Sequence, residues 1–315
     1  MQTKNYYQTM KDGAKIKINK WSPDSDEKVK GVVVLHHGLA EHSMRYDRFG
    51  SILTENGYIL IAHDIRGHGA TAELAQQEKT GSFGKLADKD GFYKAVDDLY
   101  EIIICAKTEY PDTKIFLMGH SFGSIISQGF IEKYSHAIDG CILCGTTYMP
   151  QFVSHFGHAL FCLVRTFKGK NKTSKFLRNL AFFGYNKRVS DSDNPNAWVS
   201  KSKINLEMYD SDRWCGIPLT TSFFCDLVYA LNQIGKNKNI KKIRKDLPLD
   251  FIYGSEDPVG NYGKSIQKLI SIYKKNEIKN IQVKIYEDDR HEILNEDDKD
   301  VVESDLINWL DNLTK

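Results

Sequence analysis

Lys114-Ile-Phe-Leu-Met-Gly119-His120-Ser121-Phe122-Gly123-Ser-Ile-Ile126 is the stretch on which the predicted fold depends. An apolar run is followed by a Gly-x-Ser-x-Gly motif and then by apolar residues at helical spacing, which predicts a strand, a sharp turn and a helix. In such a turn the serine hydroxyl projects clear of the backbone, toward a base and toward donors for an oxyanion. The strand and the helix come close together there, so the positions two before and two after Ser121 must lack bulk, and both are glycine. Ser121 is therefore the candidate nucleophile.

Length and charge narrow the class of protein. With 315 residues and 41% hydrophobic content, the chain can bury a large core, as one α/β domain with an insertion or as two domains. Its 43 Lys and Arg nearly balance its 41 Asp and Glu, so the net charge of +2 gives no reason to expect nucleic acid as a partner. The first residues lack the apolar core of a signal peptide, and no segment approaches about 18 consecutive apolar residues. We expect a soluble cytoplasmic protein.

Strand and helix patterns alternate along the chain. A hairpin signal at Lys11-Asp12-Gly13 predicts strands at residues 6–10 and 15–21, and six further strands are predicted at 31–36, 58–63, 115–118, 138–144, 249–253 and 281–286. Helices are expected after Ser121 and at residues 44–54, 92–110, 265–273 and 299–313, and a polar loop at 64–84. This order predicts a mostly parallel eight-stranded sheet of the α/β class, with helices on both faces and an antiparallel hairpin at its start. We expect a core made of residues 1–146 and 219–315, and a helical cap or lid inserted at 147–218.

Neither the cysteines nor the loop histidines predict a metal site. Cys141 and Cys144 match a C-x-x-C pattern, but they lie in a predicted buried strand, where residues three apart point to opposite faces. We expect both to pack in the core. Four histidines occur in two separate loops, without the helical pairing or nearby cysteine typical of zinc sites, and are expected to hydrogen-bond loop backbone: His37, His42, His63 and His68.

The position of His291 makes it the candidate base. In an open parallel sheet, ligands bind beyond the carboxyl ends of the strands. When a strand–turn–helix serine is the nucleophile, its partners follow in the order serine, acid, histidine. Of the four histidines after Ser121, only His291 lies in a loop just past the end of a predicted strand; the others are His136, His155 and His158. We expect His291 to take the proton of Ser121 during attack and to return a proton to the leaving alcohol.

The acid that orients His291 is expected in the loop after the strand at 249–253. Asp257 is the candidate there, and Glu256 is the nearest alternative. Asp288 and Asp289 are interpreted as solvated loop charges, because carboxylates are mostly exposed.

Two backbone N–H groups are the expected oxyanion donors. One belongs to Phe122, which follows the nucleophile, and the other to Leu39, in the loop after the strand at 31–36.

Several ordered motifs together resemble one family, the serine α/β hydrolases of the monoacylglycerol lipase and lysophospholipase type (serine aminopeptidase S33-like). The resemblance covers nearly the whole chain and rests on His37-Gly38-x-x-Glu41-His42, Asp64-x-Arg66-Gly67-His68-Gly69, Gly119-His120-Ser121-x-Gly123, Gly254-x-x-Asp257-Pro258 and Arg290-His291-Glu292-x-x-Asn295-Glu296. It implies an α/β-hydrolase fold, a catalytic triad of Ser121, Asp257 and His291, an oxyanion hole from Leu39 and Phe122, and no cofactor or metal.

The insertion is where substrate choice is expected. Phe152, Phe156 and Leu160 belong to an apolar stripe at helical spacing there. The helix that carries this stripe either packs as a cap helix or presents apolar surface to an acyl chain. Residues 165–188 carry eight Lys or Arg and no acid, a pattern typical of a solvated face or of transient contact with a membrane surface.

The combined interpretation is a carboxylester hydrolase that cleaves single-chain lipid esters, monoacylglycerols or lysophospholipids, through an acyl-enzyme. The alternatives are an esterase or thioesterase for another acyl substrate, such as a feruloyl or short-chain ester, a proline-type aminopeptidase, and a catalytically inactive module that binds lipid.

Overall fold

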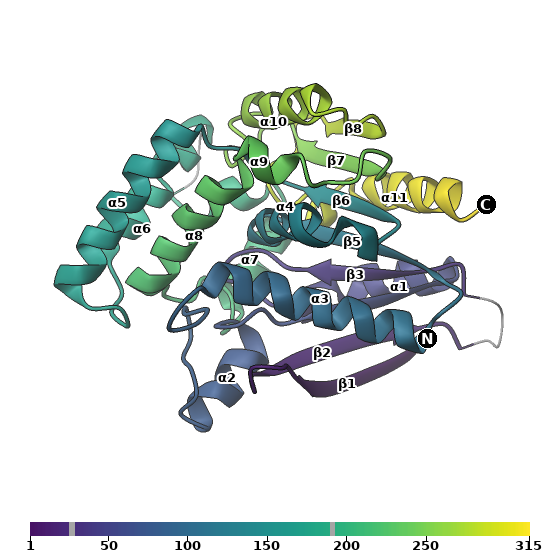
Figure 1. The fold of residues 1–315 in the computed structure, drawn as a ribbon, viewed down its shortest axis with the longest axis horizontal. Coiled ribbons are helices and arrows are strands. Elements are labelled where there is room, and N and C mark those ends of the chain that lie inside the picture. The colour runs from purple at the N-terminus through teal and green to yellow at the C-terminus, as the bar shows by residue number, and fades with distance from the viewer. Residues whose placement is uncertain (25–28, 190–192) are drawn as a thin grey trace.

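A single eight-stranded sheet forms the centre of the computed structural model, which describes residues 1–24, 29–189 and 193–315 (Figure 1). The strand order is β1-β2-β4-β3-β5-β6-β7-β8. The strands are β1 (Gln2–Thr9), β2 (Lys15–Ser22), β3 (Gly31–His36), β4 (Tyr58–His63), β5 (Lys114–His120), β6 (Gly140–Cys144), β7 (Leu249–Gly254) and β8 (Ile281–Tyr286). β1 and β2 pair antiparallel, β2 also pairs antiparallel with β4, and the pairs from β4 to β8 are parallel. The predicted sheet with its opening hairpin is confirmed.

The register brings the ends of the parallel strands to one edge of the sheet. His36 at the end of β3 is paired with His63 of β4 and with Gly119 of β5. The loops that follow β3, β4 and β5 therefore start next to one another, as expected for a ligand site at the carboxyl ends of the strands. Burial explains why these strands carry continuous apolar runs, since every residue of β3, β4, β6 and β7 is buried.

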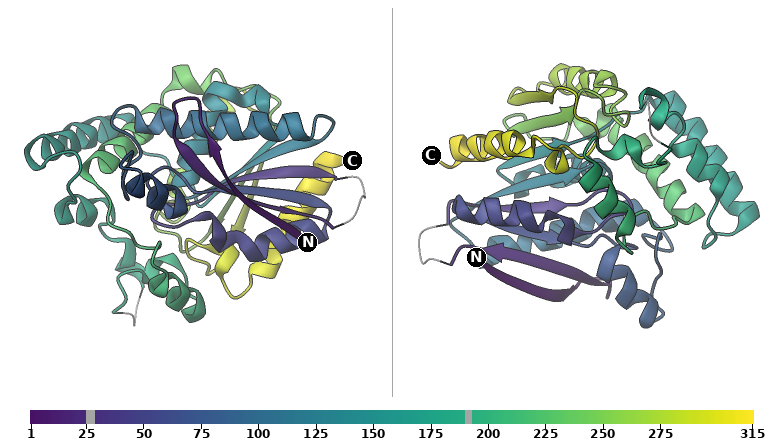
Figure 2. Two further views of the ribbon diagram at one scale, coloured as in Figure 1. Left: turned by 90° about the horizontal axis from the view of Figure 1, so that it is seen from below. Right: turned by 180° about the vertical axis from the view of Figure 1, so that it is seen from behind.

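Helices cover both faces of the sheet and enclose two hydrophobic cores (Figure 2). One core lies under α3 (Gly91–Glu109), α4 (Phe122–Tyr134), α8 (Thr221–Ile234) and α10 (Lys264–Lys275). The other lies under α1 (Asp47–Glu55) and α11 (Lys299–Thr314). Cys141 packs in the first core and Cys144 in the second, both as free thiols. The prediction that these two cysteines point to opposite faces is confirmed.

The predicted polar loop at 64–84 is partly wrong, because α2 (Gly69–Gln77) lies within it. This helix buries only small side chains in its first turn, at Ala70, Thr71 and Ala72. Alanine has the highest helix propensity, and the residues between Gly69 and Gln77 include no run of large apolar side chains at helical spacing. A search for an apolar stripe could therefore not detect it.

The segment between β6 and α8 is helical, as expected for the insertion. It contains α5 (Gln151–Lys168), α6 (Lys175–Ala181), α7 (Lys203–Ser211) and short turns at Tyr185–Arg188 and Ala197–Val199. Residues 190–192 of the predicted insertion lie outside the described residues. Figure 1 shows α5, α6 and α8 gathered beyond the end of the sheet toward which β3 points. Within the described ranges, no helix combines the length and the apolar character needed to cross a membrane.

Candidate active site

Ser121 occupies a strained turn between β5 and α4. Its φ of 52° and ψ of −117° are unusual for a residue with a side chain and cost on the order of 1–3 kcal/mol. The backbone is held on both sides, because the N–H donates to Cys144 O at 2.9 Å and the carbonyl accepts from Ser124 N at 2.9 Å. A Cβ at Gly119 would lie 2.5 Å from Gly123 O, and a Cβ at Gly123 would collide with the end of β3. The predicted need for two glycines is confirmed.

His291 is hydrogen-bonded to Asp257. The distance from His291 Nδ1 to Asp257 Oδ2 is 3.0 Å, and both side chains are buried. The second carboxylate oxygen of Asp257 accepts from Val259 N at 2.8 Å, which fixes its orientation. Glu256 points elsewhere, with its carboxylate 3.6 Å from Arg188. The geometry therefore pairs His291 with Asp257 and not with the alternative, Glu256.

The other side of the His291 ring faces the nucleophile turn. Its ring centroid lies 4.9 Å from that of His120, the residue before Ser121, and 5.2 Å from that of Trp198 in the insertion. A Cβ at Gly145 would lie 3.0 Å from His291 Cε1, so the residue that follows β6 also borders the ring. Among the described residues, His291 Nε2 is buried without a hydrogen-bond partner, and it makes none with Ser121. Catalytic hydrogen bonds are often long before substrate binds, and Nε2 is the free nitrogen that a base requires.

The loop after β3 is fixed by Glu41. Its carboxylate accepts a hydrogen bond from the backbone N–H of Gly38. A Cβ at Gly38 would lie 3.2 Å from Ser121 Cβ, which places this loop directly against the nucleophile. The N–H groups of Leu39 and Phe122 donate to no other loop or side chain within the described residues. Both predicted oxyanion donors are thus unoccupied in backbone segments next to Ser121.

A buried arginine, which the sequence analysis did not single out, ties three segments together. Arg45 lies 2.7 Å from Glu41, 2.6 and 2.7 Å from the two oxygens of Glu292, and 3.1 Å from Asn205 of α7. Burial alone would raise the pKa of Glu41, but Arg45 and His120 hold that pKa well below its ordinary value. The loop after β3, the loop carrying His291 and the insertion thus share one ion network. The i, i+4 spacing of Glu41 and Arg45 was the one sequence signal for it.

The interpretation of Asp289 as a solvated charge is wrong, whereas Asp288 is exposed as expected. Asp289 is fully buried and lies 2.5 Å from Lys201 Nζ. Burial raises the pKa of Asp289 to about 6, against the opposing effect of Lys201. The cover comes from the insertion, which is about 90 residues away in the chain, so local sequence gave no indication of it.

Two of the four loop histidines bind backbone, as predicted. His37 Nδ1 lies 2.7 Å from the oxygen of the next residue, and its Nε2 accepts from Ile65 N at 2.9 Å. His68 Nδ1 lies 3.0 Å from Arg66 O. Burial lowers the pKa of His37 to about 4 and that of His68 to about 3. Both rings are therefore neutral at physiological pH.

For the other two histidines the prediction is wrong. His63 packs edge-on against His36 at a centroid distance of 4.5 Å, and neither ring has a hydrogen-bond partner within the described residues. Burial lowers the pKa of His63 to about 3. His42 bonds a side chain instead of backbone, with Nε2 2.8 Å from Asp212 Oδ2. That partner lies in the insertion, 170 residues further along the chain, where pattern analysis could not find it.

The apolar stripe of α5 faces solvent. Phe152, Phe156 and Leu160 are 73%, 60% and 40% exposed. The opposite face of α5 packs on α8, with the rings of Phe161 and Phe224 6.1 Å apart. Other apolar side chains between α5 and α7 are also exposed: Val153, Leu163, Phe167, Phe176, Leu180, Phe183, Ile204 and Met208. The three predicted substrate contacts are therefore exposed on α5, and no hydrogen bond or ring contact within the described residues links them to Ser121. The exposed apolar side chains of α5 are hereafter called the outer apolar face.

Comparison with known proteins identifies the family. The model of the family described as serine aminopeptidase, S33 matches residues 27–298. The chain belongs to this family. It is similar to the monoglyceride lipase of Rattus norvegicus, with 30% identity over 248 residues, 78% of this chain and 71% of the rat protein. It is also similar to the monoacylglycerol lipase of Mycolicibacterium smegmatis, with 24% identity over 304 residues, 95% of this chain and 93% of that protein.

The fold of this S33 family member has close structural counterparts. A thermostable carboxyl esterase from Bacillus coagulans superposes with a TM-score of 0.89 at 24% identity, covering 100% of both chains. The α/β-hydrolase fold expected from the motifs is confirmed, and the chain is a hydrolase of the serine type.

Proposed function

We propose that this S33 family member hydrolyses carboxylic esters of single-chain lipids, monoacylglycerols or lysophospholipids, with Ser121, Asp257 and His291 as its catalytic triad. The observation that carries the proposal is the buried hydrogen bond between His291 and Asp257, next to a strained serine turn at the carboxyl edge of the sheet. The names of the relatives, monoglyceride and monoacylglycerol lipases, support the choice of substrate class.

Each residue then has a defined task. His291 Nε2 accepts the proton of the Ser121 hydroxyl while the oxygen attacks the ester carbonyl carbon, and Asp257 stabilises the imidazolium that forms. The N–H groups of Leu39 and Phe122 stabilise the negative charge on the carbonyl oxygen. His291 returns the proton to the leaving alcohol, which leaves an acyl-enzyme on Ser121. Water, deprotonated by His291, releases the fatty acid and restores the serine. No cofactor takes part in these steps.

Aromatic side chains of the insertion support an apolar substrate. The Trp198 ring, which lies against His291, also stacks on Phe182 at 5.9 Å and meets Tyr185 at 4.9 Å. Large aromatic side chains are common in the walls of sites that bind apolar ligands. We expect a part of the lipid next to the ester to contact this group.

The outer apolar face supports transient contact with a lipid surface. An amphipathic helix with exposed aromatic residues and flanking lysines typically lies in the plane of a membrane interface. Here Phe152, Phe156 and Leu160 lie exposed on α5, and the last turn of this helix begins the cationic stretch from Arg165 to Arg188. These three residues would then meet the lipid before its ester reaches Ser121. A cytoplasmic location stays a prediction.

Hydrolysis rates over a panel of esters test the proposal. We expect monoacylglycerols and lysophospholipids to be cleaved with higher kcat/KM than feruloyl esters, acyl-CoA or amino-acyl amides, and a fluorophosphonate to label Ser121 at one equivalent per chain. A preference for feruloyl, acetyl or thioester substrates would replace the lipid assignment with another esterase. Failure of both labelling and hydrolysis would mean that the fold only binds lipid.

A further inference from the structure

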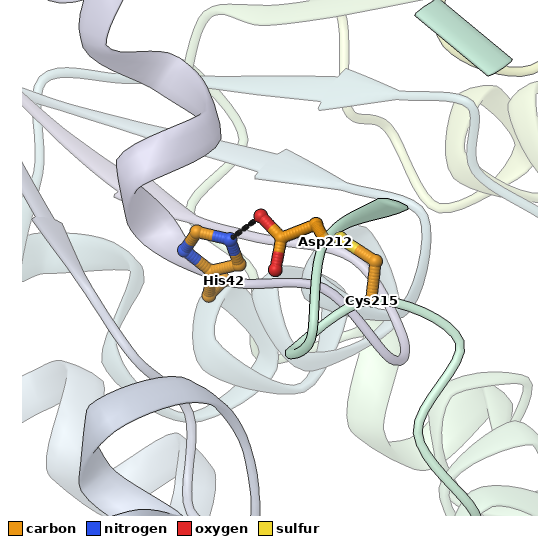
Figure 3. Close-up of side chains that lie close together, drawn as sticks. All are labelled: His42, Asp212 and Cys215. Carbon is orange, nitrogen blue, oxygen red and sulfur yellow. Dashed lines mark hydrogen bonds and ion pairs between the residues drawn. The ribbon is translucent and has the colours of Figure 1, made fainter. Parts of the chain in front are cut away.

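Three metal-ligating side chains from distant parts of the chain meet beside the active-site loop. One nitrogen of His42, one oxygen of Asp212 and the sulfur of Cys215 all lie within 4.8 Å of one another (Figure 3). His42 ends the loop after β3, whereas Asp212 and Cys215 follow α7 at the end of the insertion. Among the described residues, no other group of three His, Cys, Asp or Glu side chains comes this close together.

We propose that His42, Asp212 and Cys215 form a binding site for a divalent cation of borderline softness, with Zn²⁺ the best match. Imidazole nitrogen, thiolate sulfur and carboxylate oxygen are its usual ligands, at about 2.0–2.3 Å from the ion. Ligand atoms around a tetrahedral ion lie roughly 3.5 Å apart. The three atoms here lie within 4.8 Å of one another, so small side-chain rotations are enough to bring them to that spacing around an ion. The mixed N, S and O donor set disfavours Mg²⁺ and Ca²⁺, which require oxygen ligands.

The ligands are already held in place by their surroundings. The second oxygen of Asp212 accepts from Trp214 N at 2.8 Å, which leaves one oxygen free to face His42. Burial would raise the pKa of Asp212, but hydrogen bonds from Trp214 and His42 outweigh it, so that pKa is lowered and the carboxylate is charged at neutral pH. Cys215 N donates to Asp212 O at 3.1 Å, closing a short turn that sets the spacing of the two ligands. In metal sites, hydrogen bonds of this kind orient the side chains that bind the ion.

A route for the ion and for a fourth ligand is present. His42 is buried, but Asp212 and Cys215 are only partly covered, and the intervening Arg213 is exposed. Water can therefore reach the open coordination position. On binding, the S–H bond of Cys215 breaks, a Zn–S bond forms and the proton goes to solvent. The hydrogen bond between His42 Nε2 and Asp212 Oδ2 also breaks, and the imidazole, with its proton on the other ring nitrogen, gives the ion its lone pair.

A bound ion would fasten the insertion to the oxyanion loop. The connection already exists in weaker form, since Gly216 N donates to Ala40 O at 2.9 Å, and Ala40 follows Leu39. A cation held by His42 on one side and by Asp212 and Cys215 on the other would add strong bonds to this contact. Occupancy should therefore raise the melting temperature of the whole protein.

Titration of the metal-free protein with Co²⁺ provides a direct spectroscopic test. We expect one ion per chain, with a thiolate-to-cobalt absorption band and tetrahedral ligand-field bands, both removed by added Zn²⁺. Cys215→Ser should abolish the thiolate band and weaken binding by at least about tenfold, and Asp212→Asn should weaken it similarly. The matched control is Cys162→Ser, because Cys162 Sγ also lies near a histidine, 3.3 Å from His158 Nε2, and near Cys225, but these three side chains do not form a group as close as that of His42, Asp212 and Cys215. This control should bind cobalt like the wild type.

Thermal unfolding keeps the test independent of any folding defect. Zn²⁺ should raise the melting temperature of the wild type and of Cys162→Ser, but not of Cys215→Ser or Asp212→Asn, each compared with its own metal-free state. The proposal is overturned if the wild type shows no cobalt bands at about 100 μM Co²⁺, if the thiolate band survives in Cys215→Ser, or if it is lost in Cys162→Ser.

Discussion

At the scale of single residues, Ser121, Asp257 and His291 are expected to act as a unit. Ser121→Ala and His291→Ala should each lower kcat by roughly 10⁴-fold or more, and the double variant should be little worse. Asp257→Asn should also be severely impaired, because it removes the acceptor 3.0 Å from His291 Nδ1. Glu256→Gln is the control, since that carboxylate faces Arg188. Ester hydrolysis measures all five variants, and near-normal turnover in Asp257→Asn with loss in Glu256→Gln would reverse the acid assignment.

Arg45 carries a second residue-scale prediction, for stability. Arg45→Met would leave Glu41 and Glu292 buried without their cation, and we expect the free energy of unfolding in urea to fall by about 3–5 kcal/mol. Arg213→Met is the matched control, because its ion pair with Glu73 is exposed and should contribute no more than about 1 kcal/mol. Equal effects of the two substitutions would contradict a structural role for the buried network.

At the scale of elements, α5 is predicted to act through its exposed face. Phe156→Ala with Leu160→Ala should reduce binding to phosphatidylserine vesicles and hydrolysis of vesicle-borne monoacylglycerol severalfold, because each lost apolar contact weakens partition into the interface. Both side chains are exposed, so kcat/KM on a dissolved short ester should not change. Val301→Ala on α11, also exposed, should alter neither measurement. A fall on the short ester would show instead that α5 supports the catalytic site.

The cationic stretch that begins in the last turn of α5 adds a salt-dependent part to the same interaction. Replacing Lys168, Lys170 and Lys172 with glutamate should weaken vesicle binding most at low ionic strength, since added salt screens charges at a membrane surface. Cosedimentation with anionic vesicles at low and high salt measures this. Vesicle binding that is insensitive to salt would identify the stretch as an ordinary solvated face.

At the scale of the whole molecule, the buried histidines predict loss of stability in acid. The pKa values of His37, His63 and His68 lie at about 4, 3 and 3, whereas a histidine in an unfolded chain has a pKa of about 6.5. Below that pH the unfolded state binds protons that the folded state excludes, so the free energy of unfolding decreases from pH ~6.5 toward pH ~4. Each such histidine contributes up to about 1.4 kcal/mol per pH unit.

Urea unfolding at several pH values between about 7.5 and 5 measures this dependence. His63→Leu should reduce the slope by up to one proton, because this ring has no hydrogen bond within the described residues that leucine would lose. His136→Leu is the control, since that side chain is exposed and should leave the slope unchanged. An unaltered slope in His63→Leu would mean that other groups control the acid sensitivity.

Most of the fold, but less of the site, could be predicted from sequence. Strands buried on both faces give continuous apolar runs, and the bounds of β3 and β4 match the prediction. The bounds of the more exposed edge strand β8 match as well. The helix α2 was missed because alanine and threonine give no apolar stripe. Asn205, which contacts Arg45 and Glu292, and Lys201, which pairs with Asp289, were missed for another reason. Each reaches the active-site loops from the insertion, and the contact depends on how that segment folds back.

The outer apolar face also has a consequence for the protein in plain buffer. Without lipid, nothing within the described residues covers Phe156 and its neighbours, and exposed apolar patches promote association between copies. The sheet edges are better protected, because β1 exposes Lys4 and β8 exposes Lys284, and lysines on edge strands oppose strand addition. Clusters that form in concentrated samples should therefore join through α5 and disperse when a mild detergent is added.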